Sequence, residues 1–125
     1  MAMQFKPATK RQAKARIALA GPSGSGKTMT ALLLAQAMGT RIALVDTERG
    51  SASKYAGDPG IPAFDVVELE SFSPTEYMAA IEAAEQAGYD VMILDSISHA
   101  WSGKDGILEQ VDVALAKSKS GNAFT

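Results

Sequence analysis

The chain has 125 residues, a formal net charge of −2 and no cysteine, and 46% of its residues are hydrophobic. This length and composition fit one globular domain, and the lack of cysteine excludes disulfide bonds and thiolate metal sites. No apolar stretch approaches the roughly 20 residues that span a bilayer, and the N-terminus lacks the apolar core of a secretory signal, so we expect a soluble cytoplasmic protein with no membrane partner.

Basic residues crowd the N-terminus. Lys and Arg fill five of the first sixteen positions without any acidic residue, which leaves 7 basic and 14 acidic residues in the rest of the chain. We therefore expect a basic arm over residues 1–15 and one domain over residues 16–125. Such an arm can touch nucleic acid or a phosphorylated partner, or it can be a solvated lead into the first strand. A transit peptide fits less well, because the arm has little serine.

The first predicted strand leads into a phosphate-binding pattern. Residues 16–20 are an apolar run, and the next eight residues fill every fixed position of the pattern G-x-x-x-x-G-K-[ST]. These eight residues are Gly21, Pro22, Ser23, Gly24, Ser25, Gly26, Lys27 and Thr28. Strand, glycine loop and helix follow in the order that the pattern requires, which predicts binding of a nucleoside triphosphate.

The residue types of this loop suit a polyphosphate. Glycines let several backbone N–H donors converge on the anion, and the N-terminus of the following helix adds its positive end. Lys27 can reach the β- and γ-phosphates, and Thr28 offers a hydroxyl to Mg²⁺. Thr30, in the first turn of that helix, joins the predicted nucleotide contacts. The pattern predicts binding and leaves the reaction open.

Strands and helices alternate along the rest of the chain. Helices are predicted at residues 27–38, 74–87 and 106–119, and strands at residues 41–46, 64–69 and 90–95. Gly39 and Gly88 follow the first two helices, where glycine commonly ends a helix, and Ser73 can cap the second by accepting from the N–H of Glu76. The alternation predicts an α/β fold with a mostly parallel sheet sandwiched by helices, in which ligands bind beyond the carboxyl ends of the strands.

Two carboxylates stand at the carboxyl ends of predicted strands. Asp95 closes an apolar strand and is predicted to hold Mg²⁺ through water, although an aspartate there can also cap a helix or form a turn. Ser96 can hydrogen-bond the metal's water or cap the following turn. Glu48, two residues past Asp46, can aim a water at the γ-phosphate and take its proton, or it can be a solvated acid paired with Arg49.

Residues 41–48 resemble the strand of RecA-type recombinases that ends in their catalytic glutamate, and the other elements follow in the RecA order. Two phrases narrow the resemblance, namely Asp-Thr-Glu-Arg-Gly-Ser at residues 46–51 and Asp-Ser-Ile-Ser-His-Ala-Trp at residues 95–101. They are similar to the RecA-like AAA ATPases that bacteriophages encode, including those that resemble single-strand annealing and recombination proteins. The resemblance covers residues 15–125 and implies a RecA-like P-loop ATPase in the cytoplasm of a bacterial host.

The resemblance assigns a role to each matching position. It makes Glu48 the general base and Lys27 the catalytic contact to the phosphates. Thr28 and Asp95 become the residues that hold Mg²⁺, the latter through water. Tyr55 lies seven residues after Glu48, where RecA has a tyrosine that stacks on adenine, which implies ATP as the nucleotide.

Other positions near these residues keep two interpretations. Ala52 stands where RecA has an acid, so one polar contact to the nucleobase is absent and base selectivity is left open. Without the resemblance, Tyr55 is ordinary loop packing. Trp101 can stack on a DNA base or pack under a loop, and His99 can be a catalyst or a hydrogen-bonded neighbour of the site. Lys104 can meet a phosphate or water.

The resemblance implies work on DNA. We expect hydrolysis of ATP to ADP and phosphate with Mg²⁺, coupled to single-stranded DNA binding, annealing or recombination in a phage. Other nucleotide hydrolases use a cationic finger from a neighbouring subunit, which predicts a homo-oligomeric ring or filament. Two alternative functions stay open. The chain can be a P-loop kinase that phosphorylates a small acceptor, or a nucleotide-dependent switch or partition-type module with slow hydrolysis.

A RecA-like core continues with a further strand and a DNA-binding loop after the last helix predicted here. In that fold the further strand lies between the glycine-loop strand and the strand that ends at Asp95. We therefore expect a core that is incomplete at its C-terminus, in a piece of a longer ATPase that can be inactive alone. If the chain is whole, the two flanking strands can close up instead.

Overall fold

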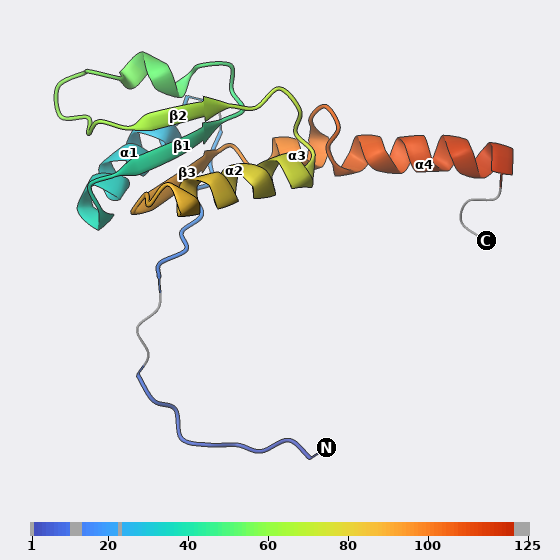
Figure 1. Cartoon of the computed structure of the whole chain (residues 1–125), viewed down its shortest axis with the longest axis horizontal. Coiled ribbons are helices and arrows are strands. Elements are labelled where there is room, and N and C mark those ends of the chain that lie inside the picture. Colours follow the sequence, from blue (N-terminus) through green and yellow to red (C-terminus); the bar gives the residue numbers. More distant parts are fainter. Residues whose placement is uncertain (1, 11–13, 23, 122–125) are drawn as a thin grey trace.

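The computed structural model describes residues 2–10, 14–22 and 24–121, and its centre is a parallel sheet of three strands. The strands are β1 (Ile42–Asp46), β2 (Asp65–Glu68) and β3 (Val91–Asp95), in the order β2-β1-β3 (Figure 1). The register places Asp46 of β1 opposite Glu68 on one side and Asp95 on the other. Three carboxylates therefore line up at one end of the sheet.

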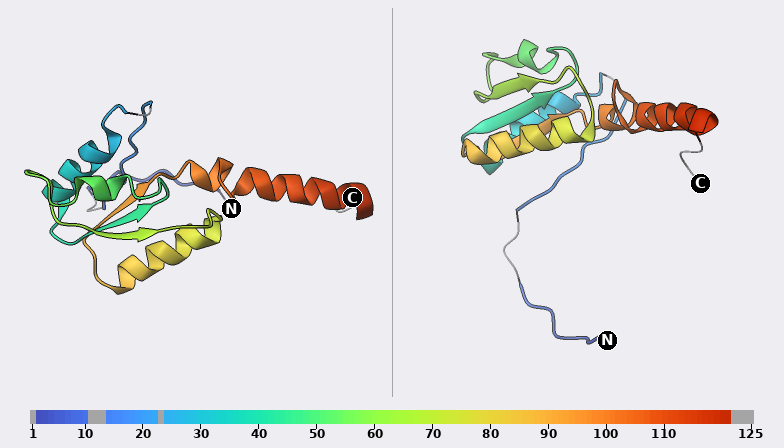
Figure 2. Two further views of the ribbon diagram at one scale, coloured as in Figure 1. Left: turned by 90° about the horizontal axis from the view of Figure 1, so that it is seen from above. Right: turned by 45° about the vertical axis from the view of Figure 1, so that its right-hand side comes forward.

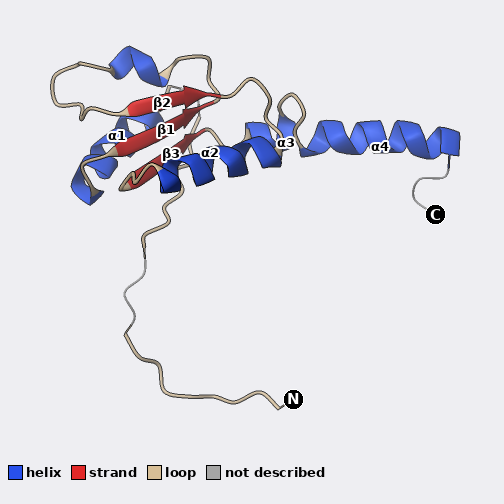
Figure 3. Cartoon of the chain, in the orientation of Figure 1, coloured by secondary structure: helices blue, strands red, loops and turns tan. Residues whose placement is uncertain are grey.

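Helices cover both faces of this sheet. Helix α1 (Lys27–Met38) lies on one face and helix α2 (Pro74–Gln86) on the other, as the view from above shows (Figure 2, left). The Ser73 side chain accepts a hydrogen bond from the Glu76 N–H at 3.4 Å, and Pro74 occupies the first turn, so α2 begins where its capping pattern predicts. The structure confirms the predicted α/β class with a parallel sheet between helices (Figure 3).

The core lies mainly between α1 and the sheet. Two small clusters of buried side chains form it, one of Leu32, Leu44 and Ala52 and one of Ala35, Ile42 and Val91. Ala52 belongs to a short 3₁₀ helix, η1 (Ala52–Tyr55), inside the loop that the sequence predicts between the second and third strands. The core therefore fixes β1, the central strand, against the helix that starts at the glycine loop.

The predicted strand over residues 16–20 does not form. Residues 14–22 have no regular secondary structure, and Ile17 and Leu19 are 59% and 40% exposed. An apolar run becomes a strand only when a neighbouring strand supplies its hydrogen-bond ladder, and within the described residues the outer edge of β3 is paired with no strand. No described strand pairs with residues 16–20, so the prediction of a strand there was wrong.

The C-terminal part leaves the sheet. A short helix, α3 (His99–Ser102), follows β3, and helix α4 (Ile107–Gly121) then projects away from the other elements (Figures 1 and 2). The sequence predicts α4 but not α3. In the described ranges, no helix is both long enough and apolar enough to cross a membrane.

Candidate nucleotide-binding site

The glycine loop has the backbone conformation that its sequence pattern requires. Gly24 and Gly26 have φ angles of 80° and 89°, a left-handed region that glycine enters without steric cost. Apart from the chain neighbours of each glycine, no atom of the described residues lies within 4 Å of the position that a Cβ would take. The N–H of Ser25 donates to the carbonyl of Pro22 at 3.2 Å and closes a turn. Ser23 lies outside the described residues. The loop thus leaves open space beside Gly24 and Gly26, as a phosphate cradle needs.

Helix α1 begins directly at this loop. Lys27 is its first residue, and the Lys27 ammonium donates to the carbonyl oxygens of Gly21 and Pro22. The first N–H groups of a helix have no acceptor within the helix and carry its positive end, so they point a partial positive charge at the loop. Thr30 is exposed, and its N–H donates to the carbonyl of Gly26 at 3.0 Å. This hydrogen bond belongs to the first turn of α1, and it leaves the predicted contact of the Thr30 side chain with the nucleotide untested.

Thr28 and Asp95 meet although 67 positions separate them. The Thr28 hydroxyl donates to Asp95 Oδ2 at 2.7 Å, because α1 packs beside β3. A hydroxyl and a carboxylate are hard oxygen ligands of the kind that Mg²⁺ takes. Among the described residues no three His, Cys, Asp or Glu side chains gather as a metal cage. The pair fits Mg²⁺, which usually keeps several waters and bonds to one or two protein groups.

Asp46 closes the turn that presents Glu48. Its buried carboxylate accepts the N–H of Glu48 at 2.7 Å and the N–H of Gly50 at 2.8 Å. Arg49 and Gly50 have φ angles of 56° and 84°, so the chain reverses tightly here. This role of Asp46 was not predicted, although an aspartate just before a turn with glycine is a common Asx-turn signal.

The Glu48 side chain points to the segment after β3. Its Oε1 accepts the Ser96 hydroxyl at 3.0 Å and lies 3.6 Å from His99 Nδ1, and 40% of the side chain is exposed. These contacts replace the pairing with Arg49 that the sequence left open. Ser96 also shares a 2.7 Å hydrogen bond with Ser98, so its hydroxyl belongs to the surroundings of Glu48 instead of the Thr28–Asp95 pair.

Behind Glu48 lies a half-buried polar network. Thr47 Oγ1 accepts the N–H of Ser96 at 2.8 Å and is 2.7 Å from His99 Nδ1. The Tyr77 hydroxyl donates to the Ser96 carbonyl at 2.7 Å, and burial raises the pKa of Tyr77 above its usual 10.0, so it stays a proton donor. Sequence reasoning missed Thr47 and Tyr77, and no local signal marks either of them.

The candidate residues fall into two neighbouring groups. Lys27, Thr28 and Asp95 form one, and Glu48 with its partners forms the other; the Thr47 N–H, which donates to the Asp95 carbonyl at 2.8 Å, links them. Tyr55 is half-buried and packs against the Leu32, Leu44 and Ala52 cluster.

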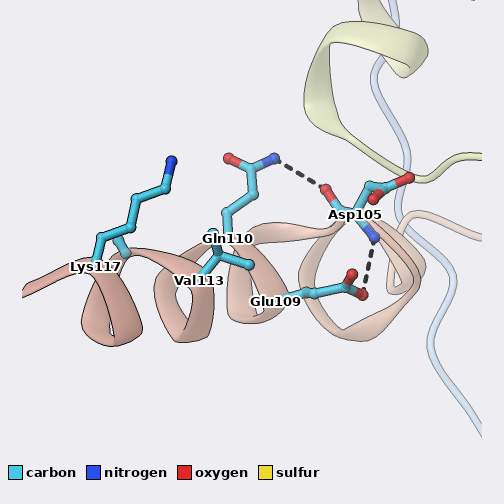
Figure 4. A pocket seen from close by; sticks show the side chains of 6 residues that line it. Asp105, Glu109, Gln110, Val113 and Lys117 are labelled. Carbon is cyan, nitrogen blue, oxygen red and sulfur yellow. Dashed lines mark hydrogen bonds between the residues drawn. The ribbon is translucent and has the colours of Figure 1, made fainter. Parts of the chain in front are cut away.

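Two features of the C-terminal part lie outside both groups. Trp101 is 56% exposed. A hollow of about 340 Å³ follows one flank of α4 and is lined by Asp105, Glu109, Gln110, Val113, Ala114 and Lys117 (Figure 4). It contains no residue of the glycine loop and belongs to a different part of the molecule.

A parallel sheet between helices, a glycine loop that opens α1 and an acidic strand end beside Thr28 define the class of P-loop nucleotide-binding domains. A family of AAA domains matches residues 13–125, which is most of the chain. The chain therefore belongs to the AAA domain family, whose members are nucleotide-binding ATPases. Neither the curated proteins nor the solved structures include a significant match to it.

Proposed function

We propose that this domain binds ATP at the glycine loop and hydrolyses it to ADP and phosphate with Glu48 as general base. The observation that supports this most is the 2.7 Å contact between Thr28 and Asp95 at the start of α1. It brings the end of the glycine loop and an acidic strand end to one place, as phosphate and Mg²⁺ binding require. Lys27 would bind the phosphates once its ammonium leaves the carbonyls of Gly21 and Pro22.

Thr28 and Asp95 would hold Mg²⁺, the latter through water. When bound, the ion neutralises the charge that develops on the phosphate oxygens. The helix N-terminus and the loop N–H groups act on the same oxygens from the protein side. Residues 16–125 form the catalytic domain in this proposal, and residues 1–15 are an arm outside it.

Glu48 has a free oxygen for the hydrolytic step. Oε1 is engaged by Ser96, whereas Oε2 has no hydrogen bond within the described part of the chain. A water aimed by Oε2 would form a bond from its oxygen to the γ-phosphorus and pass its proton to the carboxylate. The bond from the γ-phosphorus to the bridging oxygen breaks, and its electron pair leaves with ADP.

The finer part of the proposal is coupling to single-stranded DNA in a homo-oligomeric, RecA-like phage ATPase. It rests on the resemblance of residues 46–51 and 95–101 to such proteins. The exposed Trp101, Lys104 and the basic arm are the surfaces that DNA would reach first. Tyr55 would contact adenine in the same proposal, which requires it to leave part of its present packing.

The test compares nucleotide binding and ATP turnover, with and without single-stranded DNA, in the wild type, Lys27→Ala and Glu48→Gln. Glu82→Gln is the matched control, because Glu82 is an exposed glutamate of α2. We expect Lys27→Ala to lose binding and Glu48→Gln to bind ATP but turn over about 10²- to 10⁴-fold more slowly, the usual contribution of a general base.

Other outcomes point to the rival functions. Turnover that survives Glu48→Gln contradicts hydrolysis by this base and favours phosphoryl transfer to a small acceptor. Tight ATP binding with no turnover, on DNA or off it, favours a nucleotide-dependent switch. If DNA does not change the turnover, the proposed coupling to DNA is contradicted and the proposed ATPase activity stands.

A further inference from the structure

Within the described residues, the Glu48 carboxylate is held through one of its two oxygens only. Ser96 donates to Oε1 at 3.0 Å, and because an ionised carboxylate has no proton to give, the proton of the 2.7 Å Ser96–Ser98 contact must come from Ser98. His99 Nδ1 faces the same oxygen at 3.6 Å. Both neighbours come from the segment after β3, whereas Glu48 follows β1.

His99 is itself held firmly. The Phe72 ring lies 5.0 Å from the His99 ring, centroid to centroid, and the Phe72 N–H donates to the carbonyl of Lys104 at 2.9 Å. A Cβ at Gly103 would come within 2.5 Å of Phe72 and 2.7 Å of the His99 carbonyl. Only glycine allows this close approach. The packing therefore orients the imidazole towards Thr47 and Glu48.

The hydrogen bonds of Thr47 determine which atom is the donor in its contact with His99. Thr47 Oγ1 already accepts the Ser96 N–H, and its single proton can go to the Ser96 carbonyl at 3.1 Å or to His99 Nδ1 at 2.7 Å. If the proton goes to Ser96, then Nδ1 of His99 carries a proton, which it donates to Thr47 at 2.7 Å, and Glu48 Oε1 lies 3.6 Å from the same nitrogen. All three Thr47 contacts are satisfied only in this arrangement.

We propose that His99 is a positioning residue for Glu48: with Ser96 it fixes Oε1, so that Oε2 remains directed to the hydrolytic water. This inference rests on the proposed function and names a further residue of the same site. His99 does not touch the nucleotide in this account. Its loss should slow the chemical step and leave nucleotide affinity unchanged.

Three variants test the role in turnover. Asparagine can place an amide nitrogen near the position of Nδ1, whereas glutamine reaches the position of Nε2. We expect His99→Ala and His99→Gln to lower kcat by about 10- to 10²-fold, since a shift of about 1 Å at a reacting group can cost about 10²-fold. His99→Asn should recover part of the rate, and all three should bind ATP like the wild type.

A second readout needs no turnover. His99 is the single histidine of the chain, so its carbon-bound ring protons give resolved NMR signals. Glu48→Gln should move these signals, and the control Glu82→Gln should not. Unmoved signals in Glu48→Gln overturn the inference, as does an unchanged kcat in His99→Ala while Glu48→Gln abolishes turnover. If the wild type shows no turnover, the proposed function is contradicted, and so is this inference, which depends on it.

Discussion

The two ends of the parallel sheet use charged groups differently. At the amino-terminal end, Asp90 Oδ2 accepts the N–H groups of Thr40 and Arg41 at 3.0 and 2.9 Å, and these bonds hold the pKa of Asp90 below its usual 3.8. Arg41 donates to the carbonyl of Ala87 at 2.8 Å and lies 4.7 Å from the Tyr89 ring centroid. These groups are committed to joining the segments that enter β1 and β3.

At the carboxyl end of the sheet, the carboxylates differ in how many of their oxygens accept hydrogen bonds within the described residues. Asp46 uses both oxygens on backbone N–H groups, whereas Asp95 and Glu48 each use one oxygen on a side-chain hydroxyl. Asp46 and Asp95 are direct neighbours in the register, so the same residue type serves two purposes at one edge. A carboxylate that is satisfied by backbone N–H groups builds the turn, and one that is left half-satisfied is available to a ligand.

Replacing Asp46 should have the largest effect on stability. Asp46→Ala removes two hydrogen bonds to a buried carboxylate and leaves the N–H groups of Glu48 and Gly50 without their partner. We expect the free energy of unfolding to fall by about 3 kcal/mol. Urea unfolding measures it, with Asp58→Ala, at an exposed loop position, as control. Equal losses in the two variants would contradict a structural role for Asp46.

Replacing Asp95 should have a smaller effect on stability, and it should weaken ATP binding only when Mg²⁺ is present. Asp95→Ala removes one half-buried hydrogen bond from Thr28, which is worth about 1 kcal/mol. ATP affinity should weaken in the presence of Mg²⁺ and stay near the wild-type value without it, as titrations with and without the ion would show. A Mg²⁺-independent loss would mean that Asp95 shapes the loop and does not serve the metal.

Local patterns in the sequence predict most of these elements. The loop residues, the start of α1, the Ser73 cap and the strand that ends at Asp95 each depend on residues that are close in sequence, so the pattern contains the physical cause. Residues 16–20 show the limit. Their apolar pattern suits a strand, but a strand needs a partner that local sequence does not name, and here the run stays exposed.

The surroundings of Glu48 could not be predicted for a related reason. Ser96 and His99 lie about fifty positions away along the chain, and they reach Glu48 only through the pairing of β1 with β3. Asp46 and Asp95 both close apolar strands, and the glycine four positions after Asp46 is the local sign that Asp46 closes a turn. The distinction depends on the tight reversal at Arg49 and Gly50.

At the amino-terminal end, Asp90 should give an acid-dependent effect. Its pKa is lowered in the folded state, so its contribution is present above the ordinary value of 3.8 and is lost as pH falls through the folded pKa. Asp90→Asn should be less stable than the wild type near neutral pH, and the difference should shrink in acid. Thermal unfolding across this range measures it. Asp58→Asn, as control, should leave the wild-type acid dependence in place.

Tyr89 should give the smallest effect, and with the opposite pH dependence. Its hydroxyl donates to Asp65 Oδ2 at 2.6 Å, and this hydrogen bond raises the pKa of Tyr89 above 10.0. Because the folded state binds the proton more tightly, this contribution is complete below the unfolded pKa and declines as pH rises through the folded one. Tyr89→Phe should be slightly less stable than the wild type at neutral pH, and the two should converge in alkali. Thermal unfolding from neutral to alkaline pH tests this, since Tyr77, whose pKa is also raised, titrates alike in both proteins. A gap that persists in alkali would mean that Tyr89 acts through the Arg41 contact with its ring, which phenylalanine keeps only in part.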